Sequence, residues 1–243
     1  MSMKLLLTLG AFFCVGCGAG GAGGENRRAN SGSAANQTPA ITFNTNVNSN
    51  SNANAADNSV VVQKQLAIKQ IEVPEEVNFQ AGILPNDWQW FDPDGKNSPT
   101  KYDTSNAVLR LEAPSGKDLF GETTTAPRLT KVVTGDFEIE TRVRIEPQTS
   151  YQGAGILVMR DEKNFLRLER GKGGIGADES GVRFDKSEGG IYETLSPTNK
   201  NITEANVVEL KIRRAGEEYT AFWRESAGGG AWKEIAKFSG NFG

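Results

Sequence analysis

The sequence predicts an all-β protein with the architecture of an antiparallel two-sheet sandwich or jelly roll, and three observations lead to this class. Apolar and polar residues alternate with period two over most of residues 60–243, as they do in half-buried strands. Turn sequences such as Pro93-Asp94-Gly95 and Glu188-Gly189-Gly190 separate the alternating stretches. No stretch of ten or more residues carries an apolar stripe at helical spacing. Many short strands without crossover helices indicate two packed antiparallel sheets.

The strand expected over residues 136–146 shows this alternation most clearly. Four apolar residues are predicted to point into the core: Phe137, Ile139, Val143 and Ile145. Four charged residues are predicted to line the opposite face: Glu138, Glu140, Arg142 and Arg144. Burying the charged groups would cost several kcal/mol each. Exposing the apolar groups would forfeit about 1.5–3 kcal/mol each, so both terms favour the same facing.

Residues 1–16 are predicted to be a lipoprotein signal peptide. Lys4 precedes the apolar stretch 5–13, which is shorter than the roughly 20 residues that span a bilayer. The following Cys14-Val15-Gly16-Cys17 resembles a lipobox, in which the last cysteine is lipidated and becomes the mature N-terminus. Cys14 stands where leucine is usual, so a plain secretory signal or a C-x-x-C redox pair stays open as an alternative. We expect Cys17 to carry a lipid that holds the protein to a membrane.

Residues 17–59 are predicted to be the lipidated Cys17 followed by a disordered stalk. Of the 42 residues from 18 to 59, 30 are Asn, Ala, Gly or Ser. Residues 44–54 alternate asparagine with small or β-branched residues, but asparagine disfavours strands, so we expect no strand there. Such a segment buries too little apolar area to offset a backbone ordering cost of about 1–2 kcal/mol per residue. We therefore expect one domain, residues 60–243, on a flexible tether.

Composition excludes several classes of function. The chain contains no histidine, which rules out a Ser-His-Asp triad, a Cys-His dyad and any metal site with histidine ligands. The net charge is −3, so no basic surface is expected for nucleic acid, and we expect no nucleic-acid partner.

A series of segments between residues 87 and 238 follows in an order and spacing typical of one family. These segments are Trp88-Gln89-Trp90-Phe91, Leu109-Arg110-Leu111-Glu112-Ala113-Pro114, Lys117-Asp118-Leu119-Phe120, Ala126-Pro127-Arg128-Leu129, Thr134-Gly135-Asp136-Phe137-Glu138-Ile139-Glu140, Tyr151-Gln152-Gly153-Ala154-Gly155-Ile156-Leu157-Val158, Asn164-Phe165-Leu166-Arg167-Leu168-Glu169 and Ala231-Trp232-Lys233-Glu234-Ile235. Together they resemble a domain family of the concanavalin A-like lectin/glucanase superfamily, labelled in some members as regulation-of-enolase-like. The resemblance implies a jelly roll whose concave sheet binds glycans in those members that bind them. It implies no reaction.

The same resemblance implies a final strand after the hairpin of Trp232, a residue that we expect in the core. Residues up to 243 do not supply that strand. Either the protein continues beyond this sequence, or the sandwich lacks its last strand and one sheet has an exposed edge. Both alternatives stay open.

The expected strand 136–146 also bears on enzymatic activity. Retaining glucanases of the superfamily carry Glu-Ile-Asp-x-Glu on one strand, with the outer glutamates as nucleophile and general acid. Here the corresponding residues are Glu138-Ile139-Glu140-Thr141-Arg142, so an arginine stands in the position of the acid. A guanidinium is too poor an acid to protonate a leaving group near neutral pH. We expect no glucanase activity by this motif, although carboxylates on other strands, such as Glu169 or Asp161, leave hydrolysis as an alternative.

The polar strand faces are the expected ligand surface. The candidate polar residues are Glu138, Glu140, Arg142, Arg144, Arg167 and Glu169. The candidate aromatic platforms are Trp88, Trp90, Tyr151 and Trp223. Planar hydrogen-bonding groups beside aromatic rings are typical of carbohydrate sites. The alternative is a solvated face of cross-strand ion pairs, each worth about 0.2–1 kcal/mol, with the tryptophans in the core.

A calcium loop is conceivable at Asp92, Asp94 and Asn97, where oxygen ligands follow at short spacing. The pattern lacks the distant bidentate glutamate of an EF-hand, and Pro93-Asp94-Gly95 is also an ordinary turn. We expect the turn and no cofactor.

The sequence thus predicts a lipid-anchored, extracytoplasmic binding module of the bacterial cell envelope, which recognises a glycan or another extracytoplasmic ligand without catalysis. The expected partners are the membrane, through the lipid, and a glycan or an envelope protein. A protein-interaction or structural module of the envelope is one alternative, and a glycoside hydrolase is another.

Overall fold

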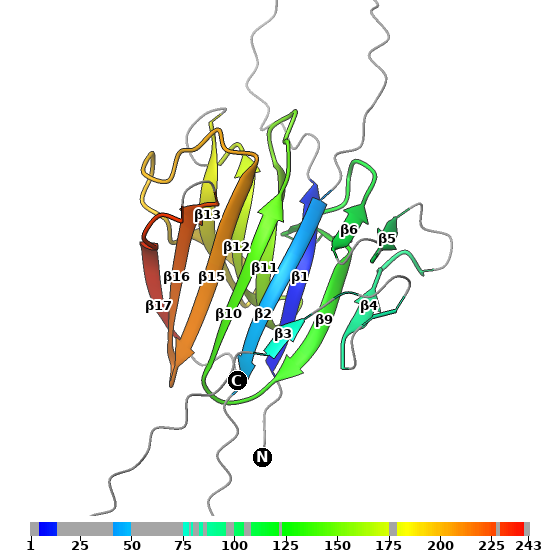
Figure 1. Ribbon diagram of the computed structural model, residues 1–243, viewed down its shortest axis with the longest axis horizontal. Coiled ribbons are helices and arrows are strands. Elements are labelled where there is room, and N and C mark those ends of the chain that lie inside the picture. The colour runs from blue at the N-terminus through cyan, green and yellow to red at the C-terminus, as the bar shows by residue number, and fades with distance from the viewer. Residues whose placement is uncertain are drawn as a thin grey trace, which may run out of the picture.

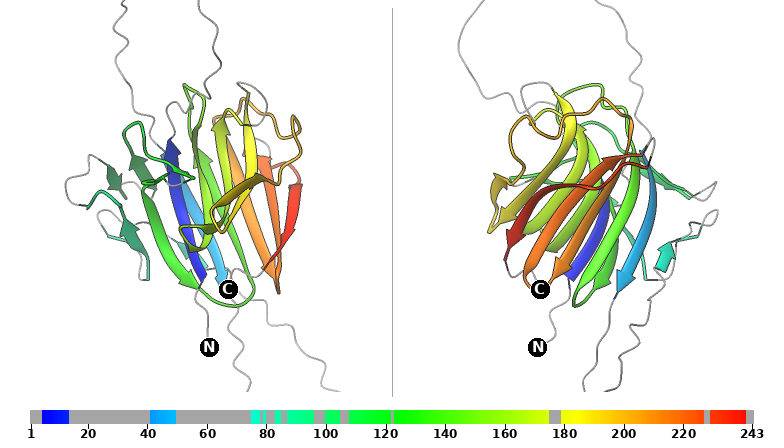
Figure 2. Two further views of the ribbon diagram at one scale, coloured as in Figure 1. Left: turned by 180° about the vertical axis from the view of Figure 1, so that it is seen from behind. Right: turned by 60° about the vertical axis from the view of Figure 1, so that its left-hand side comes forward.

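The computed structural model shows two antiparallel sheets that pack face to face, which confirms the predicted all-β sandwich (Figures 1 and 2). The structure describes residues 5–13, 41–49, 75–77, 79, 83–84, 87–95, 100–104, 108–121, 123–174, 179–226 and 229–240. Within these residues there is no α-helix, and accordingly no helix long and apolar enough to cross a membrane.

Seven strands form the first sheet, which we call sheet A. Its order is β14 (Ile191–Thr194), β13 (Ser180–Glu188), β12 (Asn164–Lys172), β11 (Gln152–Asp161), β1 (Leu5–Phe13), β9 (Arg128–Val133) and β4 (Gln89–Phe91). Each neighbouring pair is antiparallel. Strands β11 to β14 follow one another as hairpins along one half of the sheet.

The second sheet, sheet B, has a similar mixture of sequential hairpins and distant pairings. Its order is β17 (Lys233–Ser239), β16 (Glu218–Glu225), β15 (Val207–Ala215), β10 (Phe137–Arg144), β2 (Ile41–Ser49), β6 (Leu109–Glu112) and β5 (Lys101–Asp103), with β3 (Glu75–Val77) paired to β2. A separate small hairpin joins β7 (Leu119–Phe120) to β8 (Thr123–Thr124).

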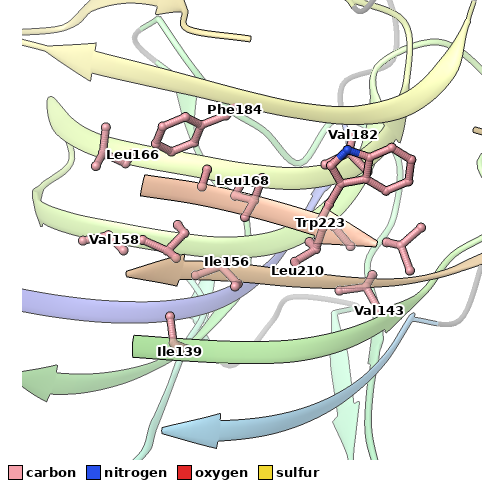
Figure 3. Close-up of a cluster of buried hydrophobic side chains, with 14 of the residues drawn as sticks. Ile139, Val143, Ile156, Val158, Leu166, Leu168, Val182, Phe184, Leu210 and Trp223 are labelled. Carbon is pink, nitrogen blue, oxygen red and sulfur yellow. The ribbon is translucent and has the colours of Figure 1, made fainter. Parts of the chain in front are cut away.

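The core fills the space between the sheets. Sheet A contributes Ile156, Val158, Leu166, Leu168, Val182 and Phe184, and sheet B contributes Ile139, Val143, Leu210 and Trp223 (Figure 3). All of these side chains are at most 2% exposed. They come from alternate positions of their strands, so burial of the alternating apolar residues positions both sheets.

The facing predicted for residues 136–146 is confirmed. Phe137, Ile139, Val143 and Ile145 are buried, whereas the charged residues between them are exposed or half-buried. Strand β10 ends at Arg144, so Ile145 follows the strand but still packs in the core.

The prediction of a disordered stalk is wrong for Ile41–Ser49, which form β2 in the middle of sheet B, so the sandwich is not confined to residues 60–243. Phe43 pairs in register with Val143, and Val47 with Ile139, and both partners on β10 are buried in the core. In isolation, this segment could not offset the ordering cost of its backbone. Between β10 and β6 its backbone groups find partners on both sides, which offsets the ordering cost. The rest of the predicted stalk lies outside the described residues.

The apolar stretch predicted to be a signal-peptide core forms β1, an internal strand of sheet A. Its residues pair with β11 from Leu6 to Phe13 and with β9 from Leu5 to Gly10. Cys17 and the lipobox lie outside the described residues. The segment predicted to be an export signal therefore has the position of a central strand in sheet A.

Candidate functional site

The charged face of β10 lies on the outer side of sheet B, and its charged side chains form ion pairs with the neighbouring strand. Lys211 Nζ lies 3.6 Å from Glu138 Oε1 and 3.2 Å from Glu140 Oε1. Arg142 Nη2 lies 2.9 Å from Glu209 Oε1. These pairs join β10 to β15. Glu140 stands directly opposite Lys211, and Arg142 stands opposite Glu209, whereas Glu138 lies two residues before Glu140 on the same strand. This arrangement matches the alternative of a solvated, ion-paired strand face, because the charged groups bind one another.

Trp232 also lies on this side of the molecule, and its expected position in the core is wrong. Its ring centroid is 4.3 Å from Lys211 Nζ and 4.3 Å from Arg224 Cζ, so the half-buried indole contacts two cations. Trp232 precedes β17, and the β16–β17 register shifts between Ala221 and Phe222. Strand alternation therefore does not determine its facing.

Arg167 and Glu169, predicted on the same ligand surface as the β10 residues, lie on the other side of the molecule. They point outward from β12 in sheet A, whereas β10 belongs to sheet B. The alternation indicated correctly that both side chains leave the core. It could not show to which sheet their strand belongs.

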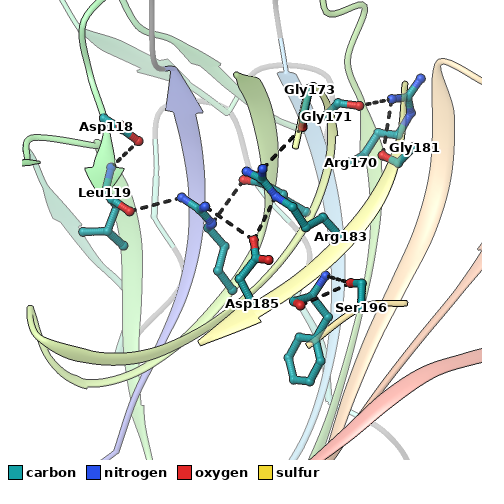
Figure 4. A network of polar contacts seen from close by, with 12 residues as sticks. Asp118, Leu119, Arg170, Gly171, Gly173, Gly181, Arg183, Asp185 and Ser196 are labelled. Atoms are coloured by element: carbon teal, nitrogen blue, oxygen red, sulfur yellow. Dashed lines mark hydrogen bonds and ion pairs between the residues drawn. The ribbon is translucent and has the colours of Figure 1, made fainter. Parts of the chain in front are cut away.

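On the outer face of sheet A, four alternating charges form a closed ring that we call the ion quartet: Arg167, Glu169, Arg183 and Asp185. In register, Arg167 stands opposite Asp185, and Glu169 stands opposite Arg183. Each arginine contacts both carboxylates: Arg167 Nε is 3.5 Å from Glu169 Oε2 and Arg167 Nη2 is 3.4 Å from Asp185 Oδ2. Arg183 Nε is 2.8 Å from Asp185 Oδ2, and Arg183 Nη2 pairs with Glu169 Oε1 (Figure 4).

Neighbouring segments cover the quartet, and all four of its members are buried. Arg167 Nη1 donates to the carbonyl of Leu119 at 3.1 Å, and Arg167 Nη2 donates to the Tyr192 hydroxyl at 2.6 Å. Tyr192 makes an edge contact with Phe120, with ring centroids 4.9 Å apart. The β7–β8 hairpin and β14 thus form the wall of the quartet, and Phe120 is 47% exposed at its rim.

Glycines on β11 provide the space into which Glu169 extends. A Cβ atom on Gly153 would lie 2.9 Å from Glu169 Cδ. Gly155 stands directly opposite Glu169 in the β11–β12 register. The sequence Gly153-Ala154-Gly155 thus keeps the outer face of β11 free of side chains at this point.

The two carboxyl groups of the quartet have pKa values that are shifted in opposite directions. Burial alone would raise the pKa of Glu169, but Arg167 and Arg183 outweigh burial and hold that pKa below its ordinary value. Complete burial raises the pKa of Asp185 above its ordinary value, and nearby Glu169 adds to the rise. The Tyr192 hydroxyl is a hydrogen-bond partner of the Asp185 carboxyl group and opposes this rise. The quartet therefore holds two buried carboxyl groups whose pKa values are shifted in opposite directions.

The predicted aromatic platforms have different positions. Trp88 and Trp223 are 5% and 2% exposed in the core, so they are not surface platforms. Trp223 pairs with Leu210 in register and donates its indole N–H to Asn201 Oδ1 at 3.1 Å, a placement that alternation alone left undecided. Trp90 is half-buried against Tyr102. Tyr151 is 46% exposed. Its backbone N–H donates to the carbonyl of Lys172, and the carbonyl of the next residue, Gly173, accepts a hydrogen bond from Arg183.

The acidic loop at residues 92–95 is a turn held by a lysine. Gly95 N donates to the carbonyl of Asp92 at 3.0 Å, and Asp94 N donates to Asp92 Oδ1 at 3.1 Å. Lys117 forms an ion pair with Asp94 and lies 4.0 Å from Asp92. Its ammonium group thus compensates the two carboxylates. Asn97 lies outside the described residues, which contain no cluster of three or more metal-ligating side chains.

The two carboxylates considered for hydrolysis are not brought together. Asp161 lies at the β11–β12 turn, where it accepts hydrogen bonds from Lys163 N and the Asn164 amide. Burial alone would raise the pKa of Asp161, but these hydrogen bonds and the neighbouring Arg160 together outweigh burial and lower it. Glu169 lies farther along β12, inside the quartet.

Sequence reasoning missed half of this site, namely Arg183 and Asp185, and also the Tyr192–Phe120 pair. A signal was available, because Val182 and Phe184 alternate with Arg183 and Asp185 in the same way as on the neighbouring strand. The pairing of β12 with β13 and the cover by a distant hairpin are properties of the tertiary structure.

Residues 96–172 match a family described as "Protein of unknown function (DUF1349)", a family with a concanavalin-like fold. The match agrees with the sandwich and ends with β12, so it includes Arg167 and Glu169 but not their partners on β13. A search of the curated proteins finds no match.

Proposed function

We propose that this protein is a non-catalytic binding module, held to a membrane of the bacterial envelope through Cys17, and that it recognises a glycan at the ion quartet. The observation that carries the proposal is the quartet itself. Burying four charges on a sheet face rarely stabilises a fold relative to apolar residues of similar size. The presence of such a cluster is therefore better explained by recognition than by stability.

The chemistry of the quartet and its rim suits a polyhydroxylated ligand. Guanidinium groups donate paired hydrogen bonds and carboxylates accept them, as sugar hydroxyls require. Asp185 offers a buried acceptor group, and Phe120 offers an exposed ring that contacts Tyr192 at the wall of the quartet. The charges on the outer face of sheet B also pair with one another, but Arg142 is 58% exposed and Glu138 is 38% exposed, so this face is more solvated than the quartet.

A glycan array probed with the full-length Cys17→Ala chain tests the ligand. We expect Phe120→Ala to weaken binding at least about tenfold, or about 1.4 kcal/mol, because it removes the exposed ring at the rim. Arg142→Ala on sheet B is the matched control and should bind like the parent chain. We also expect no release of reducing sugar from any bound glycan.

Three outcomes would change the assignment. Loss of binding in Arg142→Ala but not in Phe120→Ala would move the site to sheet B. Turnover that disappears in Glu169→Gln would show a hydrolase. An array without any bound glycan would favour the second candidate, a protein-interaction or structural module, for which the exposed Ile191 beside Tyr192 provides an apolar contact.

The anchor is tested separately. We expect Cys17→Ala to release the exported protein from membranes into the soluble fraction, because the mutation removes the lipidated thiol. Cys14→Ala should stay bound to the membrane, since position 14 lies upstream of the cleavage site. Membrane fractionation with intact-mass analysis measures both variants. An unmodified N-terminus downstream of residue 17 would disprove the lipid anchor.

A further inference from the structure

Strand β1 closes the middle of sheet A. It bonds to β11 through eight register pairs and to β9 through six. Both neighbours are antiparallel to β1, so β9 and β11 run parallel to each other with one strand position between them. Without β1 they would stand about 10 Å apart, twice the usual spacing of strands, with unpaired backbone groups along both facing edges.

The sheet cannot close this gap by moving β9 against β11. Strand β11 is held by β12 on its other side, and β9 is held by β4. Core residues on the two strands, Leu129 and Val133 on β9 and Ile156 and Val158 on β11, are packed against sheet B. A shift by one strand spacing would break that packing, so the vacated position would remain a groove with apolar walls toward the core.

The segment that fills this position is also the predicted signal-peptide core. Cleavage before Cys17 would remove all of β1 and leave β2 with the mature chain. The odd-numbered residues from Leu5 to Ala11 occupy register positions next to core residues, as in the pairs Leu9–Ile156 and Leu9–Leu129. A strand with apolar residues at alternate positions therefore suits the groove.

We propose that Leu5–Phe13 is an exchangeable strand. It closes sheet A in the unprocessed chain, and its removal leaves a strand-acceptor groove between β9 and β11 that takes up an extended apolar strand of another polypeptide, antiparallel to both walls. The removal step rests on the processing included in the proposed function, whereas the acceptor groove does not. Recognition would occur mainly through backbone hydrogen bonds, with alternate apolar side chains setting the register.

The test uses the full-length chain and two proline variants. Leu9→Pro places proline in the middle of β1, where it removes an amide donor and cannot fit an internal strand. Ala22→Pro places proline outside every described strand. We expect Leu9→Pro to lower amide-exchange protection of β9 and β11 at least tenfold, while Ala22→Pro leaves it unchanged.

A peptide tests the acceptor directly. A labelled peptide with the sequence of Leu5–Phe13, flanked by lysines for solubility, should bind the Leu9→Pro chain one to one and restore the lost protection. The same peptide with proline at the position of Leu9 should not bind. Unchanged protection in Leu9→Pro, or failure of the peptide to bind a folded Leu9→Pro chain, would overturn the proposal.

If Leu9→Pro does not fold, a chain with a protease site inserted after residue 20 replaces it. After cleavage the N-terminal fragment should co-elute with the rest of the chain and exchange for labelled peptide. Loss of the fragment without uptake of peptide would equally overturn the proposal. If the experiment with Cys17→Ala shows that the protein is not cleaved before residue 17, uptake of the peptide would still support the acceptor groove. Only the processing step would then be disproved.

Discussion

Replacing Asp185 with alanine is expected to lower the free energy of unfolding by about 3–5 kcal/mol, because it leaves Arg167 and Arg183 buried without one of their two shared carboxylates. Urea unfolding of the full-length chain measures the change. Arg142→Ala is the matched control, since it also removes one member of an ion pair, with Glu209. The Arg142 side chain is 58% exposed, so the expected loss is about 1 kcal/mol or less.

A variant that replaces the whole quartet with Met and Leu side chains separates stability from recognition. We expect it to unfold at the same urea concentration as the parent chain or at a higher one, because it removes the desolvation penalty along with the charges. It should lose glycan binding. If Asp185→Ala destabilised no more than Arg142→Ala, the quartet would not be buried as described. If the apolar variant were strongly destabilised, the quartet would be a structural element.

Gly155→Ala is expected to destabilise the protein by about 3 kcal/mol or more. A Cβ atom at this position would lie 1.9 Å from the carbonyl oxygen of Leu168 and 2.7 Å from the Cα atom of Glu169. Both contacts are with backbone in the middle of the β11–β12 pairing, so no side-chain rotation can relieve them. The strands must separate, which goes beyond the 1–3 kcal/mol typical of an overpacked core.

Gly230→Ala is the matched control for this prediction. A Cβ atom on Gly230 meets no heavy atom within 4 Å, and the residue does not have a positive φ. Alanine there should leave the unfolding midpoint unchanged or raise it slightly, because it restricts the unfolded chain. Equal urea midpoints for Gly155→Ala and Gly230→Ala would contradict the close approach of β11 and β12.

Strand facing could be predicted from the sequence because period-two alternation depends only on the strand itself. Val143 was predicted to be buried and Arg144 exposed, and both are. The same rule showed that Arg167 and Glu169 leave the core. The rule does not apply to Trp232, which lies outside a strand and was wrongly expected in the core. At Ile41–Ser49 the asparagines argued against a strand, and the strands that pair with this segment are distant in the sequence.

The sequence by itself determined the fold class, the apolar side of its clearest strands and the absence of histidine chemistry, because these depend on residue type and local periodicity. Only the tertiary structure decided which strands are neighbours. It placed β10 in sheet B and β12 in sheet A, which separated the predicted ligand residues, and it paired β12 with β13, which assembled the quartet. Pairing depends on contacts between segments far apart in the chain, and the alternation within one strand contains no information about its partner.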